Sequence, residues 1–220
     1  MSTLTTEPLK SLLTQLFSDA EASDAQMRRD NATISSQELA RRAASTDHRA
    51  FYMSAKDYHL AVSAETARLL YMLARSSGAH AIVEFGTSFG ISTLHLAAAL
   101  KDNGGGRLIG SEFEPSKVTR ARNNMRAAHL SDLVEIREGD ALESLARDLP
   151  SSIDLVLLDG AKSMYLKVLE LLEGHLRPGA LVVADNADRS PEYLARVRAA
   201  GGGYISVPFA DDVELSMKLA

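Results

Sequence analysis

Apolar residues near the start of the chain recur at the spacing of a helix with one hydrophobic face. Leu9, Leu12, Leu13, Leu16 and Phe17 fall at positions i, i+3, i+4, i+7 and i+8. A face of this kind must be covered to be stable in water. We therefore expect an N-terminal helix that packs on its own domain or on a second subunit.

Helical and strand-like stretches follow one another along the rest of the chain. Helical composition covers about residues 35–45 and 63–76, and the second stretch stops at Gly78. Beyond it, short runs rich in Val, Ile and Leu alternate with helical stretches; the predicted strands are AIVEF (81–85), RLIGSE (107–112), LVEIR (133–137), IDLVLLD (153–159) and ALVVAD (180–185). This alternation is typical of β-α-β units and a parallel sheet.

The end of the chain has a different pattern. GYISVPF (203–209) and VELSMKL (213–219) are separated by only three residues, which predicts an antiparallel hairpin at one edge of the sheet. The expected fold is therefore α/β, with a seven-stranded and mostly parallel sheet, helices on both faces and a helical N-terminal extension. We assign residues 1–50 to this extension and residues 51–220 to the α/β domain.

Composition excludes several classes of function. The 220 residues are 45% hydrophobic, and 24 Lys plus Arg against 29 Asp plus Glu give a net charge of −5 without a basic stripe, so no nucleic-acid partner is expected. The chain has no cysteine, which excludes disulfides, thiolate zinc sites and a catalytic cysteine, and favours a cytoplasmic location. No apolar stretch approaches the length of a membrane span, so no membrane partner is expected.

The segment VEFGTSFGIST (83–93) contains a literal G-x-S-x-G, the pattern of a hydrolase nucleophile elbow with Ser88 as nucleophile. An elbow requires a later acid and then a later histidine, but the last histidine, His175, precedes the fifth predicted strand. The dinucleotide pattern G-x-G-x-x-G also fails, because Ser88 and Ile91 stand where glycines belong. What remains is a glycine-rich turn that lets a ligand approach backbone N–H groups.

The second predicted strand ends in IGSEFEPS, so Glu112 lies at its carboxyl end, where a carboxylate can accept from ribose hydroxyls. With this residue the sequence resembles the class I S-adenosylmethionine-dependent methyltransferases, and among them the catechol and caffeoyl-CoA O-methyltransferases. The resemblance covers roughly residues 55–220 and is carried, in order, by VEFGTSFGIST, LIGSEFEPSKVTRARNN, IREGDALE, IDLVLLDGAK and LRPGALVVADN.

The resemblance implies a Rossmann-like methyltransferase fold and a set of cofactor-binding residues. The glycine turn is expected along the methionine part of S-adenosylmethionine and Glu112 at the ribose, while Asp140 and Ala141 are expected beside the adenine. Val62 is expected to close over the cofactor. The complete implied set is Val62, Glu84, Gly86, Ser88, Ser92, Glu112, Asp140, Ala141 and Asp159.

Oxygen ligands end two neighbouring strands of the predicted sheet. Asp159 ends the fourth strand, and Asp185 and Asn186 end the fifth. Two carboxylates and an amide suit Mg²⁺ or another hard divalent cation, which lowers the pKa of a hydroxyl that it coordinates. The resemblance implies that Lys162 takes the proton of that hydroxyl, so Lys162 and Asp159 are the expected catalytic residues. Without the resemblance, the two aspartates also read as helix caps and Lys162 as a solvated lysine.

The predicted activity is methyl transfer to a hydroxyl of a small, phenolic or catechol-like acceptor. Two alternatives remain open: a metal-independent methyltransferase of the same fold, and a protein that binds the cofactor without turnover. The acceptor itself is not defined by the sequence, because Ala161 replaces the aromatic residue of catechol-type relatives and the segment after Asn186 is short. The resemblance also implies a homodimer.

Overall fold

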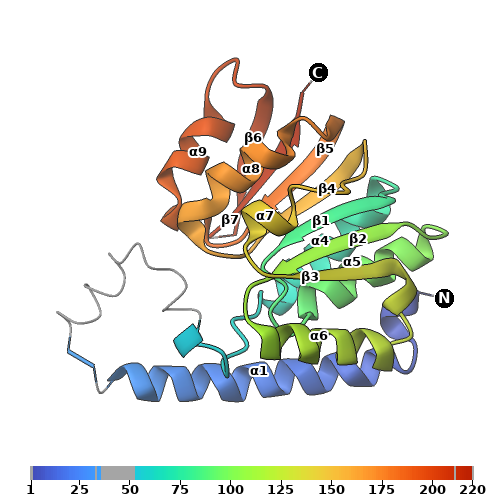
Figure 1. Cartoon of the computed structure of the whole chain (residues 1–220), viewed down its shortest axis with the longest axis vertical. Coiled ribbons are helices and arrows are strands. Elements are labelled where there is room, and N and C mark those ends of the chain that lie inside the picture. Colours follow the sequence, from blue (N-terminus) through green and yellow to red (C-terminus); the bar gives the residue numbers. More distant parts are fainter. Residues whose placement is uncertain (1, 33, 36–52, 211, 220) are drawn as a thin grey trace.

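The structure is a computed structural model that describes residues 2–32, 34–35, 53–210 and 212–219. In this part of the chain seven strands form one sheet in the order β3-β2-β1-β4-β5-β7-β6 (Figure 1). The strands are β1 (Ala81–Phe85), β2 (Arg107–Glu112), β3 (Val134–Glu138), β4 (Ile153–Leu158), β5 (Leu176–Ala184), β6 (Tyr204–Phe209) and β7 (Val213–Lys218). Strands β1 to β5 pair in parallel, whereas β7 is antiparallel to β5 and β6. The predicted sheet and its C-terminal hairpin are confirmed.

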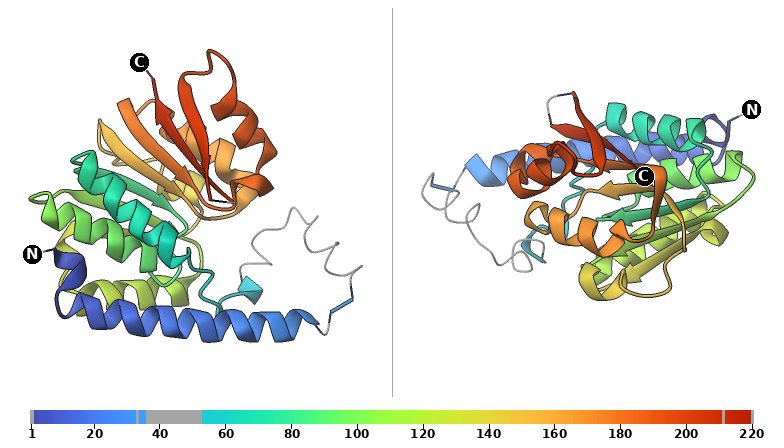
Figure 2. Two further views of the ribbon diagram at one scale, coloured as in Figure 1. Left: turned by 180° about the vertical axis from the view of Figure 1, so that it is seen from behind. Right: turned by 90° about the horizontal axis from the view of Figure 1, so that it is seen from above.

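Helices cover both faces of the sheet (Figure 2). One face carries α1 (Leu9–Ala32), α4 (Ala64–Ser76), α5 (Ile91–Asp102) and α6 (Pro115–Ala127), and the other carries α7 (Ala141–Ser144), α8 (Tyr165–Glu173) and α9 (Pro191–Arg198). Short 3-10 helices precede α1 (η1, Thr3–Thr5) and α8 (η3, Lys162–Met164). None of the helices described is long and apolar enough to span a membrane.

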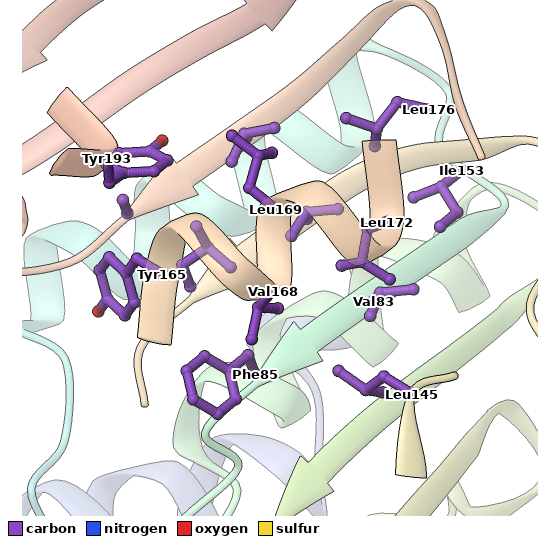
Figure 3. Packing of buried hydrophobic residues seen from close by; sticks show 14 of the residues in the cluster. Val83, Phe85, Leu145, Ile153, Tyr165, Val168, Leu169, Leu172, Leu176 and Tyr193 are labelled. Carbon is purple, nitrogen blue, oxygen red and sulfur yellow. The ribbon is translucent and has the colours of Figure 1, made fainter. Parts of the chain in front are cut away.

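The central strands are hydrophobic throughout because both of their faces are covered. In β1 and β4 nearly every residue is buried, as expected for strands inside a parallel sheet. On one face, α8 places Tyr165, Val168, Leu169 and Leu172 over the strands, and Figure 3 shows Val168 beside Phe85 of β1. This packing fixes the carboxyl ends of β1 and β4, where the candidate site lies.

The N-terminal helix is covered by its own domain. Leu9, Leu13, Leu16 and Ala20 of α1 are buried in one cluster with residues of α5 and α6, and Figure 1 shows α1 running beside α6. The apolar face predicted from the sequence therefore needs no second subunit to cover it. The helix predicted at about residues 35–45 lies outside the described residues.

The hairpin forms one edge of the sheet, with β6 outermost. Ile205, Val207 and Phe209 alternate along β6 and are 56%, 51% and 37% exposed. Met217 of β7 pairs with Ile205 and is also exposed. Pro208 also lies within β6, where it is in register with Glu214 of β7.

Candidate cofactor and metal site

The glycine turn predicted at residues 86–90 lies where the order of the strands reverses. Strand β1 is flanked by β2 on one side and β4 on the other, so the connections after β1 and β4 leave toward opposite faces of the sheet. Gly86 has φ of 98°, and a Cβ on it would lie 2.5 Å from the backbone oxygen of Asp159. This glycine therefore lets the glycine turn pack closely against the backbone that follows β4, where the predicted catalytic residue Asp159 lies.

Ser88 links three segments of the chain through hydrogen bonds, and among the described residues no histidine side chain bonds to its hydroxyl. Its hydroxyl donates to the carbonyl of His59 at 2.5 Å, and its backbone N–H donates to Glu112 Oε2 at 2.8 Å. A third bond comes from Lys117 Nζ, 3.2 Å from Ser88 Oγ. These bonds hold the residue at a positive φ of 47°, which is uncommon for a residue other than glycine. The rejection of the hydrolase interpretation agrees with this geometry.

A pocket lies between the glycine turn and the segment that precedes α4. It contains five residues of the predicted set, Val62, Gly86, Ser88, Ser92 and Asp159. The other lining residues are His59, Leu60, Ala61, Thr87, Phe89 and Ile91. Val62 is 4% exposed, and its segment covers the turn through the bond between Ser88 and His59. The sequence reasoning missed His59, because a single histidine in a loop carries no motif.

Glu84 lies behind this lining and is fully buried. Its carboxylate accepts from three hydroxyls: Ser92 at 2.6 Å, Thr93 at 2.6 Å and Thr87 at 3.0 Å. Burial raises the pKa of Glu84, and the three hydroxyl donors oppose this rise. Because the Ser92 hydroxyl is engaged with Glu84, the predicted contact of Ser92 with a carboxylate would have to use its backbone N–H, in the first turn of α5.

The residue expected at the ribose ends β2, and those expected at the adenine follow β3 at the start of α7. Glu112 Oε1 accepts from the N–H of Glu114 at 2.9 Å, while Oε2 accepts from Ser88, so both oxygens are oriented by the backbone. Asp140 is the N-cap of α7 and accepts from the N–H of Leu142 at 2.9 Å, and Ala141 is buried. Glu112, Asp140 and Ala141 are not among the lining residues of the pocket, so their roles at the cofactor stay predictions.

The two predicted catalytic residues form an ion pair. Lys162 Nζ lies 3.0 Å from Asp159 Oδ1, and the two side chains are 17% and 10% exposed. The ammonium also donates to the hydroxyl of Tyr165 at 2.8 Å, and that hydroxyl donates to the carbonyl of Asp185 at 2.7 Å. Tyr165 therefore ties the loop after β4 to the loop after β5. The sequence reasoning missed it, because a tyrosine at the start of an amphipathic helix reads as core.

The carboxyl groups of Asp159 and Asp185 meet and hydrogen-bond to each other. The pKa of Asp185 is raised to about 7, first by burial and then by repulsion from Asp159. Burial also raises the pKa of Asp159, against the effect of the Lys162 ammonium. The pair therefore carries less than two negative charges near neutral pH.

This arrangement fits a hard divalent cation with two protein carboxylates. A cation there would offset the burial and the repulsion from Asp159 that together raise the pKa of Asp185. Asn186 follows directly, but its amide Nδ2 donates to Asp212 at 2.9 Å, which leaves its oxygen as the group available for a ligand. Among the residues that the structure describes, no group of three or more His, Asp or Glu side chains could hold a metal. The predicted set is therefore two carboxylates and one amide oxygen.

The raised pKa of Asp185 predicts a pH dependence of stability for the metal-free protein. The folded state favours the protonated acid, so this contribution is present at low pH and is lost as pH rises from about 4 through about 7. In EDTA, unfolding by urea at pH 5.5 and pH 8 should show less stability at pH 8, and Asp185→Asn should reduce the difference. Added Mg²⁺ should stabilise the wild type more at pH 8, because the cation competes with the proton. Equal pH dependence of stability in the wild type and in Asp185→Asn would contradict the assignment of the raised pKa to Asp185.

Comparisons with known proteins support the resemblance. Residues 83–187, just under half of the chain, match a family profile described as a methyltransferase domain. The chain is 35% identical over 138 residues to a catechol O-methyltransferase of Niastella koreensis, covering 61% of this chain and 62% of that protein. It is 33% identical over 136 residues to a catechol O-methyltransferase of Mycobacterium tuberculosis, covering 62% of this chain and 61% of that protein. The chain thus spans about three fifths of these relatives.

A solved structure extends the match over nearly the whole chain. The O-methyltransferase TomG from Streptomyces achromogenes, involved in tomaymycin synthesis and solved in complex with S-adenosylmethionine, is 26% identical. The alignment covers 90% of this chain and 96% of that one, with a TM-score of 0.63. The resemblance to S-adenosylmethionine-dependent O-methyltransferases, inferred from five motifs, is confirmed, and so is the Rossmann-like methyltransferase fold.

Proposed function

We propose that this protein is an S-adenosylmethionine-dependent O-methyltransferase that acts on a small hydroxylated acceptor, phenolic or catechol-like, with help from a divalent cation. The observation that carries the proposal is the position of Asp159. This residue lines the pocket beside the glycine turn, and its carboxyl group also contacts both Lys162 and Asp185. A cofactor in the pocket and an acceptor at the two aspartates would therefore be neighbours.

The proposed reaction moves one methyl group. The acceptor hydroxyl loses its proton, its oxygen forms a bond to the methyl carbon, and the carbon–sulfur bond of the sulfonium breaks to leave neutral S-adenosylhomocysteine. Lys162, held by Asp159 and Tyr165, is the residue proposed to take the proton in its uncharged form. A divalent cation on Asp159, Asp185 and Asn186 would stabilise the acceptor oxyanion.

The test has two stages with purified protein. Calorimetric titration with S-adenosylmethionine and S-adenosylhomocysteine measures cofactor binding, and mass spectrometry then detects methylation of a panel of catechols and simpler phenols in Mg²⁺ or EDTA. Binding together with methylation that EDTA abolishes would support the full proposal. Tight binding with no methylation across the panel would favour a protein without turnover.

A metal-independent methyltransferase of the same fold is the second candidate. It is favoured by the ion pair between Lys162 and Asp159, because the lysine already supplies a positive charge to that carboxylate. Methylation that continues unchanged in excess EDTA would select this candidate. A homodimer and a cytoplasmic location remain predictions, to be tested by sedimentation and by fractionation of cells.

Glu112→Gln should weaken the binding of S-adenosylhomocysteine by about 1–3 kcal/mol, since a charge-assisted hydrogen bond to the ribose is lost. Calorimetry measures the change, and the substitution keeps the size of the side chain. Glu138→Gln is the matched control, because Glu138 ends the neighbouring strand in register with Glu112 and is exposed. Equal affinities in the wild type and the Glu112 variant would remove Glu112 from the site.

A further inference from the structure

Lys117 is a buried lysine that the proposed reaction does not use. It lies in the first turn of α6 and is 3% exposed. An ammonium at such a position has lost most of its hydration, and this loss is unfavourable unless charges and hydrogen bonds replace the water. A surface lysine on the same helix would avoid this loss, so the burial calls for a physical explanation.

The ammonium of Lys117 points to the glycine turn. Its Nζ donates to the hydroxyl of Ser88 at 3.2 Å, and it lies 5.4 Å from the centre of the Phe89 ring. An ammonium has three protons to donate. Across the described residues, Ser88 is the one acceptor that the Lys117 side chain contacts, which leaves donor capacity at the turn.

Side chains of both charges surround the ammonium of Lys117. Glu112, Glu114 and Asp159 favour its protonated form, whereas Arg120 on the same helix disfavours it. Burial is the largest influence and lowers the pKa of Lys117. Nearby carboxylates thus offset part of the desolvation, and Glu112 is the one among them that also bonds to Ser88.

Lys117 and Glu112 both bond to Ser88, one as a hydrogen-bond donor and the other as an acceptor. Glu112 accepts from the backbone N–H of Ser88, and Lys117 donates to its hydroxyl. A carboxylate accepts hydrogen bonds from hydroxyl groups, while an ammonium donates to hydroxyl oxygens. Together the two side chains are complementary to a vicinal diol, in which each hydroxyl both donates and accepts.

We propose that Lys117 is a further cofactor-binding residue, whose ammonium donates to a hydroxyl oxygen of the ribose that Glu112 holds. This inference rests on the proposed function, because it assumes that S-adenosylmethionine binds with its ribose at Glu112, which like Lys117 lies beside the lining residues of the pocket and is not one of them. In the bound state the two spare donor positions of the ammonium gain an acceptor, and the bond to Ser88 keeps the lysine in place. Lys117 thereby contributes to affinity for the nucleoside half of the cofactor.

The test compares Lys117→Met with the wild type by calorimetry, using S-adenosylhomocysteine and adenosine as separate probes. Methionine keeps an unbranched side chain of similar length and removes the charge, so the fold should be retained, which a thermal unfolding curve checks. We expect Kd to rise about tenfold for both probes, since both carry the ribose. Arg126→Met is the control, because Arg126 is an exposed cation in the last turn of the same helix, and it should change neither Kd.

A second readout separates binding from a purely structural role. Affinity of the wild type should fall as pH rises through the lowered pKa of Lys117, and this fall should be absent in Lys117→Met. Lys117→Arg, which keeps the charge, should retain more affinity than the methionine variant. If Lys117→Met does not fold, the pH dependence of the wild type and the arginine variant decide.

The results that would overturn this inference differ from those that would overturn the proposed function. No binding of S-adenosylhomocysteine by the wild type would overturn the proposed function itself. Normal wild-type binding with an unchanged Kd in Lys117→Met would overturn only the role of Lys117. A weaker affinity for S-adenosylhomocysteine with an unchanged affinity for adenosine would also overturn it, because the contact would then lie on the amino-acid half.

Discussion

Gly86→Ala should destabilise the protein by about 3 kcal/mol or more, and cofactor binding should be lost with the fold of the turn. The added Cβ would lie 2.5 Å from the backbone oxygen of Asp159 and 2.6 Å from the backbone nitrogen of Gly160. Backbone atoms cannot rotate away as a side chain can, so β1 and β4 would have to separate at their carboxyl ends. The shift in the midpoint of urea unfolding measures the effect.

Gly78→Ala is the control for the strain of a positive φ alone. Gly78 has φ of 61° after α4, and a Cβ there would meet no atom within 4 Å. Its substitution should cost only about 1 kcal/mol, which is the usual cost of a left-handed conformation in a residue with a side chain. Similar losses in the two variants would mean that the contact with Asp159 does not control the stability of the turn.

Asp185→Ala should reduce kcat/KM for a vicinal diol acceptor by about a hundredfold or more, because several kcal/mol of transition-state charge stabilisation depend on this carboxylate. Affinity for S-adenosylhomocysteine should change little, since Asp185 does not line the pocket at the glycine turn. Initial rates of methylation and calorimetry provide the two measurements. Excess EDTA should reproduce the loss in the wild type, and added Mg²⁺ should restore activity there but not in the variant.

Asp188→Ala is the matched control for the loss of an acidic side chain from the same loop. Asp188 lies three residues further along and is exposed, so its removal should leave both activity and cofactor affinity unchanged. Full activity of the wild type in excess EDTA would contradict the metal hypothesis. It would favour the metal-independent candidate instead.

Much of the fold was predictable because local pattern and tertiary structure agree. Strands β1 and β2 begin and end at the predicted residues, since each is a short apolar run followed by a clear turn. Strand β5 begins four residues earlier than predicted, at Leu176. The pairing with β4 shifts register between Ile153 and Leu155, and this irregularity accommodates Pro178 and Gly179, which read as a turn in the sequence.

Helix α1 is longer than its apolar stripe. Beyond Ala20 it has no buried side chain, and the helix continues to Ala32 with polar residues. Hydrogen bonds between side chains four residues apart, such as Gln26 and Asp30, stabilise the part of the helix beyond Ala20. Ser23 also accepts from the backbone N–H of His59, a tertiary contact that no periodicity reveals.

The candidate site was predictable where ordered motifs mark strand ends. Asp159 and Asp185 meet as the parallel sheet requires, and Gly86 contacts the loop after β4. Lys117 and Tyr165 were missed for a physical reason: both lie in the first turn of a helix, and their roles depend on which loop that turn faces. The direction of the Ser92 hydroxyl was equally hidden, because Glu84 reads from the sequence as one more strand residue.

The proline in the outermost strand bears on how the protein behaves at high concentration. An edge strand with exposed apolar side chains is a template on which another chain can add as a further strand, and continued addition leads to aggregates. Pro208 has no amide hydrogen to offer to an incoming chain, so the row of donors along β6 is interrupted in the middle of its most apolar stretch. The exposed Ile205 and Val207 are therefore compatible with a chain that stays dispersed.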